Sequence, residues 1–526
     1  MKRKVVIAEP IGQAGVEQLR SAADVAVVEL EGPAAVADEV ADADALVVRS
    51  GTPVTAELVA RAGNLKVVVR AGAGVDNIDL EAATAAGVVV MNTPGANTTA
   101  ATEHTLALLL ALARRIPAAD RSLRDGRWER KKFTGFELHS KLLGVVGLGR
   151  IGTEVAARAQ AFKMRVIGYD PFLTRDRFTD RAIEMVELDE LLERADVVTL
   201  HVPLSDATRG LVGAAELARM KPGAVLLNCA RGSLVDEAAL VAALDSGHVG
   251  GAAIDAFATE PAPLPALVRH PRVVATPHLG ASTAEARDAV GKQAARQVLD
   301  ALDGSGYANA VNLPTHDPEA FARLRPYLIL VERMGALQAQ LTDGRISAAE
   351  LEVTGEFDDI APLRLAFLRG LLAPAVGALS VNYVNAPLLA RDRGIKVSES
   401  RAATSPLDYT RLVTTTVVTD GGRHVVRGTV FEQRDPHVVE IDGFRLDAIP
   451  DGNLVVCLSR DRPGVIGTIG TLFGRHRVNI SEFRLGRKDR GDVALSVITL
   501  DSAPEPAALD ELRKLPELLW ATAVTL

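Results

Sequence analysis

One glycine-rich hexapeptide constrains the fold of this chain more than any other feature. Residues 147–152 read Gly-Leu-Gly-Arg-Ile-Gly, directly after the apolar run 142–146 and before a stretch of helical composition. In a strand–turn–helix setting Gly147 permits the tight turn, Gly149 lets the backbone approach a pyrophosphate, and Gly152 lets the helix pack against the strand. The sequence therefore predicts a dinucleotide-binding turn of the Rossmann type, with the pyrophosphate at the helix N-terminus.

A carboxylate at the end of the next predicted strand indicates which dinucleotide is bound. Asp170 lies 170 − 152 = 18 residues beyond the last glycine. At this place a carboxylate accepts hydrogen bonds from both ribose hydroxyls and repels a 2′-phosphate. The combination favours NAD over NADP. The hexapeptide alone would also be compatible with a glycine-rich turn that binds no ligand.

Three charged residues follow the ends of later predicted strands, where open α/β sheets bind their ligands: Arg231, Glu260 and His278. Oxidation of a 2-hydroxy acid requires a base for the hydroxyl proton, and a histidine is well matched to that task near neutral pH. An arginine supplies a fixed, bidentate charge for the substrate carboxylate, and a glutamate can orient the imidazole. We therefore expect His278 to be the base, Arg231 the anion-binding group and Glu260 the orienting acid.

Each of these residues also has a simpler interpretation when taken alone. Arg231 can be a surface arginine, Glu260 a solvated acid before a proline, and His278 a capping residue. Their common place after strand ends, behind a nucleotide-binding turn, favours the catalytic interpretation. Cys229 lies beside Arg231, where a small buried residue is more common than a nucleophile.

Short β-rich runs alternate with Ala-rich stretches of helical period along the first 314 residues, which indicates α/β architecture with parallel sheets. We expect two Rossmann-like or flavodoxin-like domains: one for the substrate at 1–97 and 285–314, and an NAD-binding domain at 98–284 inserted in it. Residues 98–115 form a helical pattern that is apolar on nearly every face, so this helix should cross between domains or subunits.

The last 212 residues, 526 − 314, have a different pattern. From 315 to 450 strand and helix signals are mixed and no catalytic constellation is visible, so we expect an α+β intervening domain with a regulatory or structural role. Residues 451–526 read strand, helix, strand, strand, helix, strand, which predicts a small ferredoxin-like domain.

Composition limits the partners of the chain. A net charge of −8 gives no general attraction to nucleic acid or to an anionic membrane, so an anionic ligand must be bound by local Arg or Lys clusters. Two cysteines are too few for a disulfide framework and fit a reducing compartment. No signal peptide or membrane-spanning run is recognisable, and we expect a cytoplasmic protein.

Three of these motifs resemble those of the D-isomer-specific 2-hydroxyacid dehydrogenases over about the first 314 residues: the hexapeptide 147–152, Asn-Cys-Ala-Arg-Gly at 228–232 and Pro-His-Leu-Gly at 277–280. The resemblance implies that Arg231, Glu260 and His278 are catalytic, that NAD is the cofactor, that no metal is needed, and that Asp170 holds the adenosine ribose. It also implies a set of cofactor-binding residues: Gly147, Gly149, Arg150, Ile151, Gly152, Thr208, Cys229, Ala230, Arg231, Asp255, His278 and Gly280.

Further motifs at 49–52, 70–77, 92–94 and 128–131 resemble the branch of this family that oxidises 3-phosphoglycerate. For the substrate, the resemblance together with local charge points to Arg49, Ser50, Ala73, Gly74, Arg130 and Lys131. The alternative for the three basic residues is a solvated position in a loop, which is common for Arg and Lys.

The C-terminal segment resembles an ACT domain, with Asp-Arg-Pro-Gly at 461–464 before its first helix and Asn479 before the next strand. Such domains bind amino acids at paired interfaces, which implies L-serine as an effector held by Asp461 and Asn479, and a homo-oligomer, specifically a tetramer. Plain dimerisation is the alternative, because Asp before Pro and Asn at a strand start are common in turns.

Two other functions remain open at this point. One is another dehydrogenase of the family, of the glyoxylate, hydroxypyruvate or phosphite type, although the C-terminal domains have no evident use there. The other is an NAD-sensing transcriptional co-repressor, which shares the fold but usually carries a disordered tail.

Overall fold

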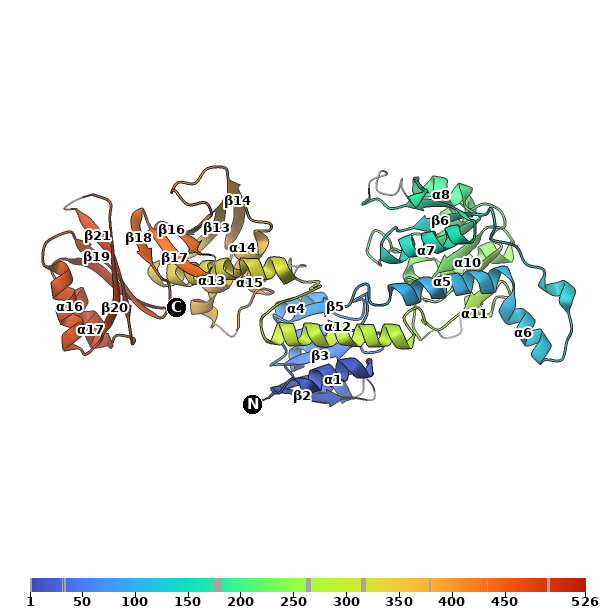
Figure 1. Ribbon diagram of the computed structural model, residues 1–526, viewed down its shortest axis with the longest axis horizontal. Coiled ribbons are helices and arrows are strands. Elements are labelled where there is room, and N and C mark those ends of the chain that lie inside the picture. Colours follow the sequence, from blue (N-terminus) through green and yellow to red (C-terminus); the bar gives the residue numbers. More distant parts are fainter. Residues whose placement is uncertain are drawn as a thin grey trace.

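The computed structural model describes residues 2–30, 32, 35–173, 181–261, 266–313, 318–377, 380–432, 434–489 and 492–526. These residues fold around four β-sheets, which lie one after another along the molecule (Figure 1). The expected series of two parallel sheets, a mixed sheet and a ferredoxin-like sheet is confirmed. The limits of the four domains stay a prediction.

The first sheet has five parallel strands in the order β2-β1-β3-β4-β5. Its strands are apolar on both faces, as in parallel sheets that helices cover on both sides. Helix α12 returns from the second sheet and packs against α1. The elements are β1 (Arg3–Ile7), α1 (Gln13–Ser21), β2 (Val25–Glu29), α2 (Val36–Glu39), β3 (Ala45–Val48), α3 (Ala56–Arg61), β4 (Val67–Arg70), α4 (Leu80–Ala85), β5 (Val89–Asn92) and α12 (Ala284–Leu302).

The second sheet has seven parallel strands in the order β12-β11-β10-β9-β6-β7-β8. The strand order reverses beside β6, and ligands of open α/β sheets bind at such a switch point. Its strands are β6 (Leu142–Val146), β7 (Arg165–Tyr169), β8 (Ile183–Met185), β9 (Val197–Leu200), β10 (Val225–Asn228), β11 (Gly251–Ile254) and β12 (Val273–Ala275). Its helices are α5 (Thr98–Ala113), α6 (Ile116–Arg124), η2 (Arg130–Phe133), α7 (Arg150–Ala161), α8 (Leu188–Arg194), α9 (Ala214–Arg219), η4 (Gly232–Leu234), α10 (Glu237–Asp245) and α11 (Ala266–Arg269).

Helix α5 is the crossing helix that the sequence predicts. It begins after β5 of the first sheet and packs along α7 and β11 of the second. Leu106, Leu108 and Leu109 are buried in the core of the second sheet. In Figure 1, α5 runs from the first sheet to the second, above the line of α12.

The third sheet is mixed, with the order β14-β13-β15-β16-β17-β18, and only β13 and β14 run parallel. Helices α13 and α14 pack closely together beside it, because Gly370 lets α14 approach the backbone of α13 at Glu332. The elements are α13 (Pro318–Leu341), β13 (Ile346–Thr354), α14 (Ala361–Val376), α15 (Ala386–Asp392), β14 (Lys396–Ala402), β15 (Leu412–Thr419), β16 (Gly422–Phe431), β17 (Asp435–Ile441) and β18 (Phe444–Ala448).

The last sheet is antiparallel in the order β20-β21-β19-β22, the ferredoxin-like arrangement. One face is covered by its two helices. The other face, with Leu454, Val456 and Val497, joins the hydrophobic core of the third sheet. The elements are β19 (Asn453–Arg460), α16 (Val465–Arg475), β20 (Ile480–Arg487), β21 (Val493–Leu500), α17 (Pro506–Arg513) and β22 (Leu518–Thr525).

Candidate active site

The carboxyl ends of the parallel strands of the second sheet meet at one edge, and the functional motifs follow them. The hexapeptide 147–152 follows β6, Arg231 follows β10, Asp255 follows β11 and His278 follows β12. Because these strands are in parallel register, residues that are far apart in sequence come together there.

The glycine-rich turn has the close packing that its sequence predicts. Gly147 adopts φ +92°, and a side chain there would meet the carbonyl oxygen of His201 at 2.7 Å. A Cβ on Gly152 would lie 1.9 Å from the carbonyl oxygen of Gly147, so the helix can approach the strand only because residue 152 is glycine. At Gly149, by contrast, nothing lies within 4 Å of an added Cβ, which leaves the backbone open to a ligand.

A cleft of about 750 Å³ opens beside this turn, and the residues that line it fit a dinucleotide. Asp170 stands at the end of β7, where its carboxylate accepts hydrogen bonds from the backbone amides of Leu148 at 3.0 Å and Phe172 at 3.0 Å. The cleft is lined by Gly95, Thr98, Leu148, Gly149, Arg150, Thr153, Glu154, Asp170, Phe172, Leu173 and Arg181.

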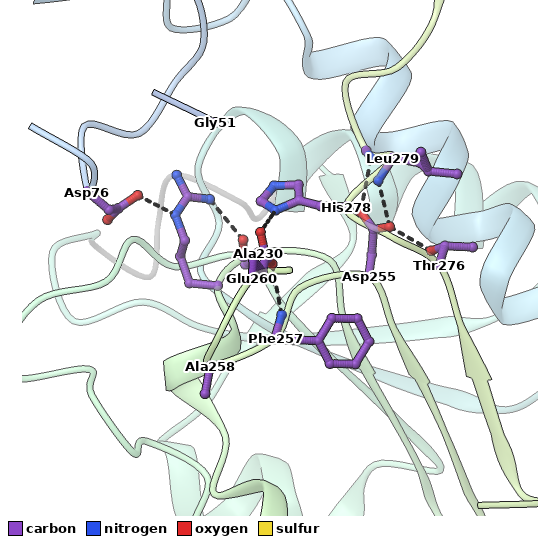
Figure 2. A network of polar contacts seen from close by, with 12 residues as sticks. Gly51, Asp76, Ala230, Asp255, Phe257, Ala258, Glu260, Thr276, His278 and Leu279 are labelled. Atoms are coloured by element: carbon purple, nitrogen blue, oxygen red, sulfur yellow. Dashed lines mark hydrogen bonds and ion pairs between the residues drawn. The ribbon is translucent and has the colours of Figure 1, made fainter. Parts of the chain in front are cut away.

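The expected base and acid are in direct contact. Nδ1 of His278 lies 2.7 Å from Oε2 of Glu260, and the other oxygen of Glu260 accepts from the backbone amide of Phe257 at 2.9 Å (Figure 2). Burial raises the pKa of Glu260, but the contact with His278 and the Phe257 amide outweigh it, so the pKa stays below its usual range. Glu260 is therefore a carboxylate at neutral pH and can hold Nδ1–H of the imidazole.

Arg231 joins the two parallel-sheet domains. Its Nε donates to Asp76 Oδ2 at 2.7 Å, and its Nη1 donates to the carbonyl oxygen of Ala230 at 2.8 Å. Asp76 belongs to the loop after β4 of the first sheet, so this ion pair crosses between the domains. Gly74 makes room for it: a Cβ there would lie 1.8 Å from Arg231 Nη2.

A cavity of about 270 Å³, here called the interdomain cavity, is lined by residues of both parallel-sheet domains. Most of the residues that the sequence assigned to catalysis and to the substrate line it, and so do several of the expected cofactor residues; Glu260 does not. The lining residues are Arg49, Ser50, Arg70, Ala71, Gly72, Ala73, Gly74, Asn97, Ala101, Ile151, His201, Val202, Pro203, Cys229, Ala230, Arg231, His278, Gly280, Ala281 and Ser282.

Arg70 is a cation in this cavity that the sequence analysis did not single out. Its Nε is buried and makes no hydrogen bond within the described part of the chain. Burial lowers its pKa to about 10, and the charges of Arg231 and Arg49 act in the same direction. Arg70 is therefore close enough to Arg231 and Arg49 to be repelled by both, and the carboxylates of Asp76 and Glu9 offset this only in part. Arg70 begins the motif 70–77, but its place at the end of a strand, before a glycine-rich stretch, does not by itself mark it as an anion-binding residue.

Asp255 has a different environment from the one expected of a cofactor contact. Its side chain is 1% exposed, and it does not appear among the residues that line the cavity. Its carboxylate accepts from the backbone amide of Leu279 at 2.8 Å and from the hydroxyl of Thr276 at 2.6 Å (Figure 2). It also accepts from the backbone amide of Gly280 at 2.9 Å. Asp255 thus holds the loop that carries His278.

Two other expected cofactor residues lie at the same sheet edge. Cys229 lines the interdomain cavity, and burial raises the pKa of its thiol to about 12, so it is a neutral packing group. Thr208 lies in the loop after β9, where its hydroxyl donates to the carbonyl oxygen of Pro203 at 2.7 Å. Thr208 lines neither the cleft nor the cavity.

Arg130 and Lys131 do not reach the interdomain cavity of their own chain. Both are exposed on η2, which follows α6. The two helices form a segment, residues 116–133, that projects from the outer end of the second domain and is here called the α6 excursion (Figure 1). Trp128, two residues before Arg130, is 82% exposed.

The expected effector residues are also separated within one chain. Asp461 lines a cavity of about 560 Å³ at the start of α16, with Arg460, Arg462 and Arg487. Asn479 precedes β20, whose first residue pairs with Leu500, at the other end of the sheet. There its amide donates to Asp501 Oδ2 at 2.8 Å.

Three family models match successive parts of the chain. Residues 106–280 match the NAD binding domain of the D-isomer specific 2-hydroxyacid dehydrogenases, residues 323–442 match the D-3-phosphoglycerate dehydrogenase intervening domain, and residues 453–517 match the ACT domain.

Similar curated proteins extend over the whole chain. A D-3-phosphoglycerate dehydrogenase from Synechocystis sp. is 41% identical over 99% of this chain and 95% of its own length. Another, from Methanocaldococcus jannaschii, is 39% identical over 99% of this chain and 100% of its own length. The chain therefore belongs to the D-isomer-specific 2-hydroxyacid dehydrogenase family. Within it, the chain is an NAD-binding oxidoreductase of the D-3-phosphoglycerate dehydrogenase type, with an intervening and an ACT domain, as the sequence predicted.

Solved structures share this fold. A glyoxylate reductase from Paecilomyes thermophila matches with a TM-score of 0.54 at 31% identity, over 59% of this chain and 98% of its own. A D-lactate dehydrogenase from Aquifex aeolicus, solved with NAD and lactic acid, matches with a TM-score of 0.52 at 26% identity, over 57% of this chain and 96% of its own. Among the described residues, no helix is long and apolar enough to cross a membrane, and no cluster of His, Cys, Asp and Glu is arranged to hold a metal ion.

Proposed function

We propose that the chain oxidises 3-phosphoglycerate to 3-phosphohydroxypyruvate with NAD, the first step of the phosphorylated route to L-serine. One observation carries this proposal: His278, held by Glu260, and Arg231 line a single cavity together with two further cations, Arg49 and Arg70. The full-length relatives named D-3-phosphoglycerate dehydrogenase support it.

The His278–Glu260 pair is suited to remove the hydroxyl proton. Because the carboxylate of Glu260 accepts the proton of Nδ1, Nε2 of His278 is left as the basic nitrogen. It takes the C2 hydroxyl proton as the C2–H bond breaks, and Glu260 stabilises the imidazolium that forms. Bound NAD would accept the hydride that leaves C2.

Arg231 is suited to bind the carboxylate and the developing C2 carbonyl. Its hydrogen bonds to Asp76 and to the Ala230 carbonyl fix the plane of the guanidinium. A charge that is already oriented stabilises a developing negative charge without reorganisation. Since Asp76 lies on the first domain, the contact also ties binding of the substrate to the approach of the two domains.

The two additional cations account for a phosphorylated substrate. A plain 2-hydroxy acid has one carboxylate, which Arg231 can hold, whereas 3-phosphoglycerate also has a phosphate. The buried and unpaired Nε of Arg70 and the repulsion of Arg70 by Arg49 and Arg231 both favour a second anionic group in the cavity. Asp170, at the end of β7, supports NAD over NADP.

The test compares NAD reduction with 3-phosphoglycerate and with D-glycerate. We expect kcat/KM to be at least about 100-fold higher for 3-phosphoglycerate, since removal of a charge-assisted contact costs about 1.5–3 kcal/mol for each hydrogen bond lost. Arg70→Gln should reduce kcat/KM for 3-phosphoglycerate far more than for D-glycerate. Arg61→Gln, on the exposed end of α3, is the control. Faster turnover of D-glycerate would contradict the substrate assignment.

We also propose that copies of the chain associate and that L-serine binds between two ACT domains. β20 is an edge strand. Antiparallel pairing of β20 with its copy would bring Asn479 of one chain to the Asp461 end of the other, which a single chain does not do. A second contact surface is suggested by the exposed apolar residues Ile116, Leu123 and Trp128 on the α6 excursion. Two different twofold contacts per chain would produce a closed tetramer.

Light scattering of the wild-type protein and of variants at these two contact surfaces tests the assembly. Wild type should be a tetramer, and Trp128→Ser should yield dimers that still respond to L-serine. Asn479→Ala should lose inhibition by L-serine while its turnover without serine is unchanged. A monomeric wild type, or serine inhibition that persists in Asn479→Ala, would contradict this part of the proposal.

A further inference from the structure

His104 lies on α5, one face of which borders the catalytic edge of the second sheet. Its Nε2 is 3.1 Å from Asp255 Oδ1 and 3.0 Å from Thr276 Oγ1. The Thr276 hydroxyl donates its proton to Asp255 at 2.6 Å, so Nε2 of His104 is the donor in both of its contacts. The side chain is 19% exposed.

Asp255, the common partner, is surrounded by donors. Two backbone amides of the loop after β12, those of Leu279 and Gly280, and two side chains, those of Thr276 and His104, point at its carboxylate. These contacts hold the pKa of Asp255 below its usual range although burial acts in the opposite direction. A buried carboxylate of this kind is stable only while its donors remain in place.

The loop that Asp255 holds has an unusual backbone conformation. His278 adopts φ +54°, in the left-handed region that residues other than glycine rarely occupy. Its backbone amide donates to the carbonyl oxygens of Asp255 at 2.9 Å and Thr276 at 3.0 Å. A conformation of this kind persists only when the surrounding contacts enforce it.

We propose that His104 is a positioning residue for His278: through Asp255 it fastens the loop 276–280 to the crossing helix α5. The link has a geometric reason. α5 leaves the first domain and its residue Ala101 lines the interdomain cavity, one helical turn before His104. The same helix therefore lines the cavity and, through the contact of His104 with Asp255, orients the His278 side chain. This inference rests on the proposed dehydrogenase function.

Steady-state kinetics of the 526-residue chain and three variants tests the proposal. His104→Leu removes the donor, and we expect kcat to fall about 10- to 100-fold with KM for NAD changed by less than about twofold, because a small displacement of a catalytic group has effects of this size. His104→Gln keeps an N–H donor and should recover most of the activity. His270→Leu is the matched control: His270 also contacts an aspartate, Asp245, at 3.3 Å, but away from the cavity.

Hydrogen exchange provides a readout that does not depend on activity. The Leu279 and Gly280 amides donate to Asp255, so the peptide 276–282 should exchange faster in His104→Leu than in wild type, His104→Gln or His270→Leu. If His104→Leu does not fold, Thr276→Val, which removes only the hydroxyl, is measured in its place with the same expectation.

The outcomes separate this inference from the proposed function. If the wild-type protein is active and His104→Leu has the same kcat, the positioning role is overturned. A lower kcat in His104→Leu without faster exchange at 276–282 would overturn it as well. If no 2-hydroxy acid supported NAD reduction by the wild-type protein, the proposed function would be overturned instead. The hydrogen-exchange comparison would still decide whether His104 fastens the loop 276–280.

Discussion

Residue 74 controls the position of the Arg231 guanidinium. An alanine there would place its Cβ 1.8 Å from Nη2, so Arg231 would have to leave Asp76 and turn away from the cavity. We expect Gly74→Ala to reduce kcat/KM about 100-fold or more, as for other displaced catalytic groups, with little change in the thermal midpoint. Gly63→Ala is the control, since nothing lies within 4 Å of its Cβ. Normal kinetics of Gly74→Ala would remove Arg231 from the proposed mechanism.

His201 makes the stability of the second domain depend on pH. Its imidazole bonds to Thr199 Oγ1 at 2.9 Å, and burial lowers its pKa to about 4 from 6.5. In the unfolded chain His201 is therefore protonated below about pH 6.5, whereas in the folded chain it stays neutral down to about pH 4. Stability should fall as the pH drops through this window, by about 3 kcal/mol at most, given about 1.36 kcal/mol for each pKa unit.

Denaturant unfolding of wild type and His201→Asn between pH 7 and pH 4 measures this effect. The difference between the two proteins should grow smaller as the pH falls, because asparagine does not titrate. A constant difference across the range would show that His201 is not held neutral in the folded protein.

At the scale of elements, the parallel strands were predictable because each is a short apolar run. Strand β6, for example, is the apolar run 142–146 that precedes the glycine-rich turn. Strand β8, of three residues, carries no such run and was not predicted. The charged motifs were predictable for the same reason, since strand ends in a parallel sheet meet at one edge.

Helix α14 shows why the third sheet's region was harder to interpret. Its residues are apolar on nearly all sides and include Pro362 and Pro374, so neither a helical period nor a clean boundary is visible. The roles of Arg70 and Asp255 were missed for a related reason. Each depends on contacts with residues distant in sequence, and nothing beside either residue reports them.

The crossing of α13 and α14 depends on residue 370. A Cβ on Gly370 would lie 1.8 Å from the carbonyl oxygen of Glu332, so the two helices would have to separate. We expect Gly370→Val to destabilise this domain by about 1–3 kcal/mol, the usual effect of overpacking. The measurement is the midpoint of thermal unfolding followed by circular dichroism. Gly467→Val is the control: its Cβ on α16 meets nothing within 4 Å, so an equal effect there would contradict the packing argument.

At the scale of the whole molecule, the third sheet's domain packs against both the ACT domain and the first sheet, and so connects the ACT domain to the catalytic domains. Its core continues into the open face of the ACT sheet. On its other side, Leu365 and Val384 are buried in the core of the first sheet, and the Asn382 side chain donates to the carbonyl oxygen of Gly87 at 2.6 Å. The first sheet carries Arg49 and Arg70, so a displacement at the ACT domain has a continuous path to the interdomain cavity.

Breaking this link should separate regulation from catalysis. Val384 is 4% exposed, and Val384→Asp would bury an unpaired carboxylate against the first sheet. We expect the intervening and ACT domains to detach together, which small-angle scattering would show as a larger radius of gyration, and inhibition by L-serine to be lost. Turnover at saturating substrate should change by less than about threefold, since the cavity residues are untouched. Val311→Asp, at a site that is 41% exposed, controls for the added charge. A variant with the larger radius that is still inhibited by serine would show that the signal does not pass through this contact, and that the effector acts on the catalytic domains by way of a neighbouring chain.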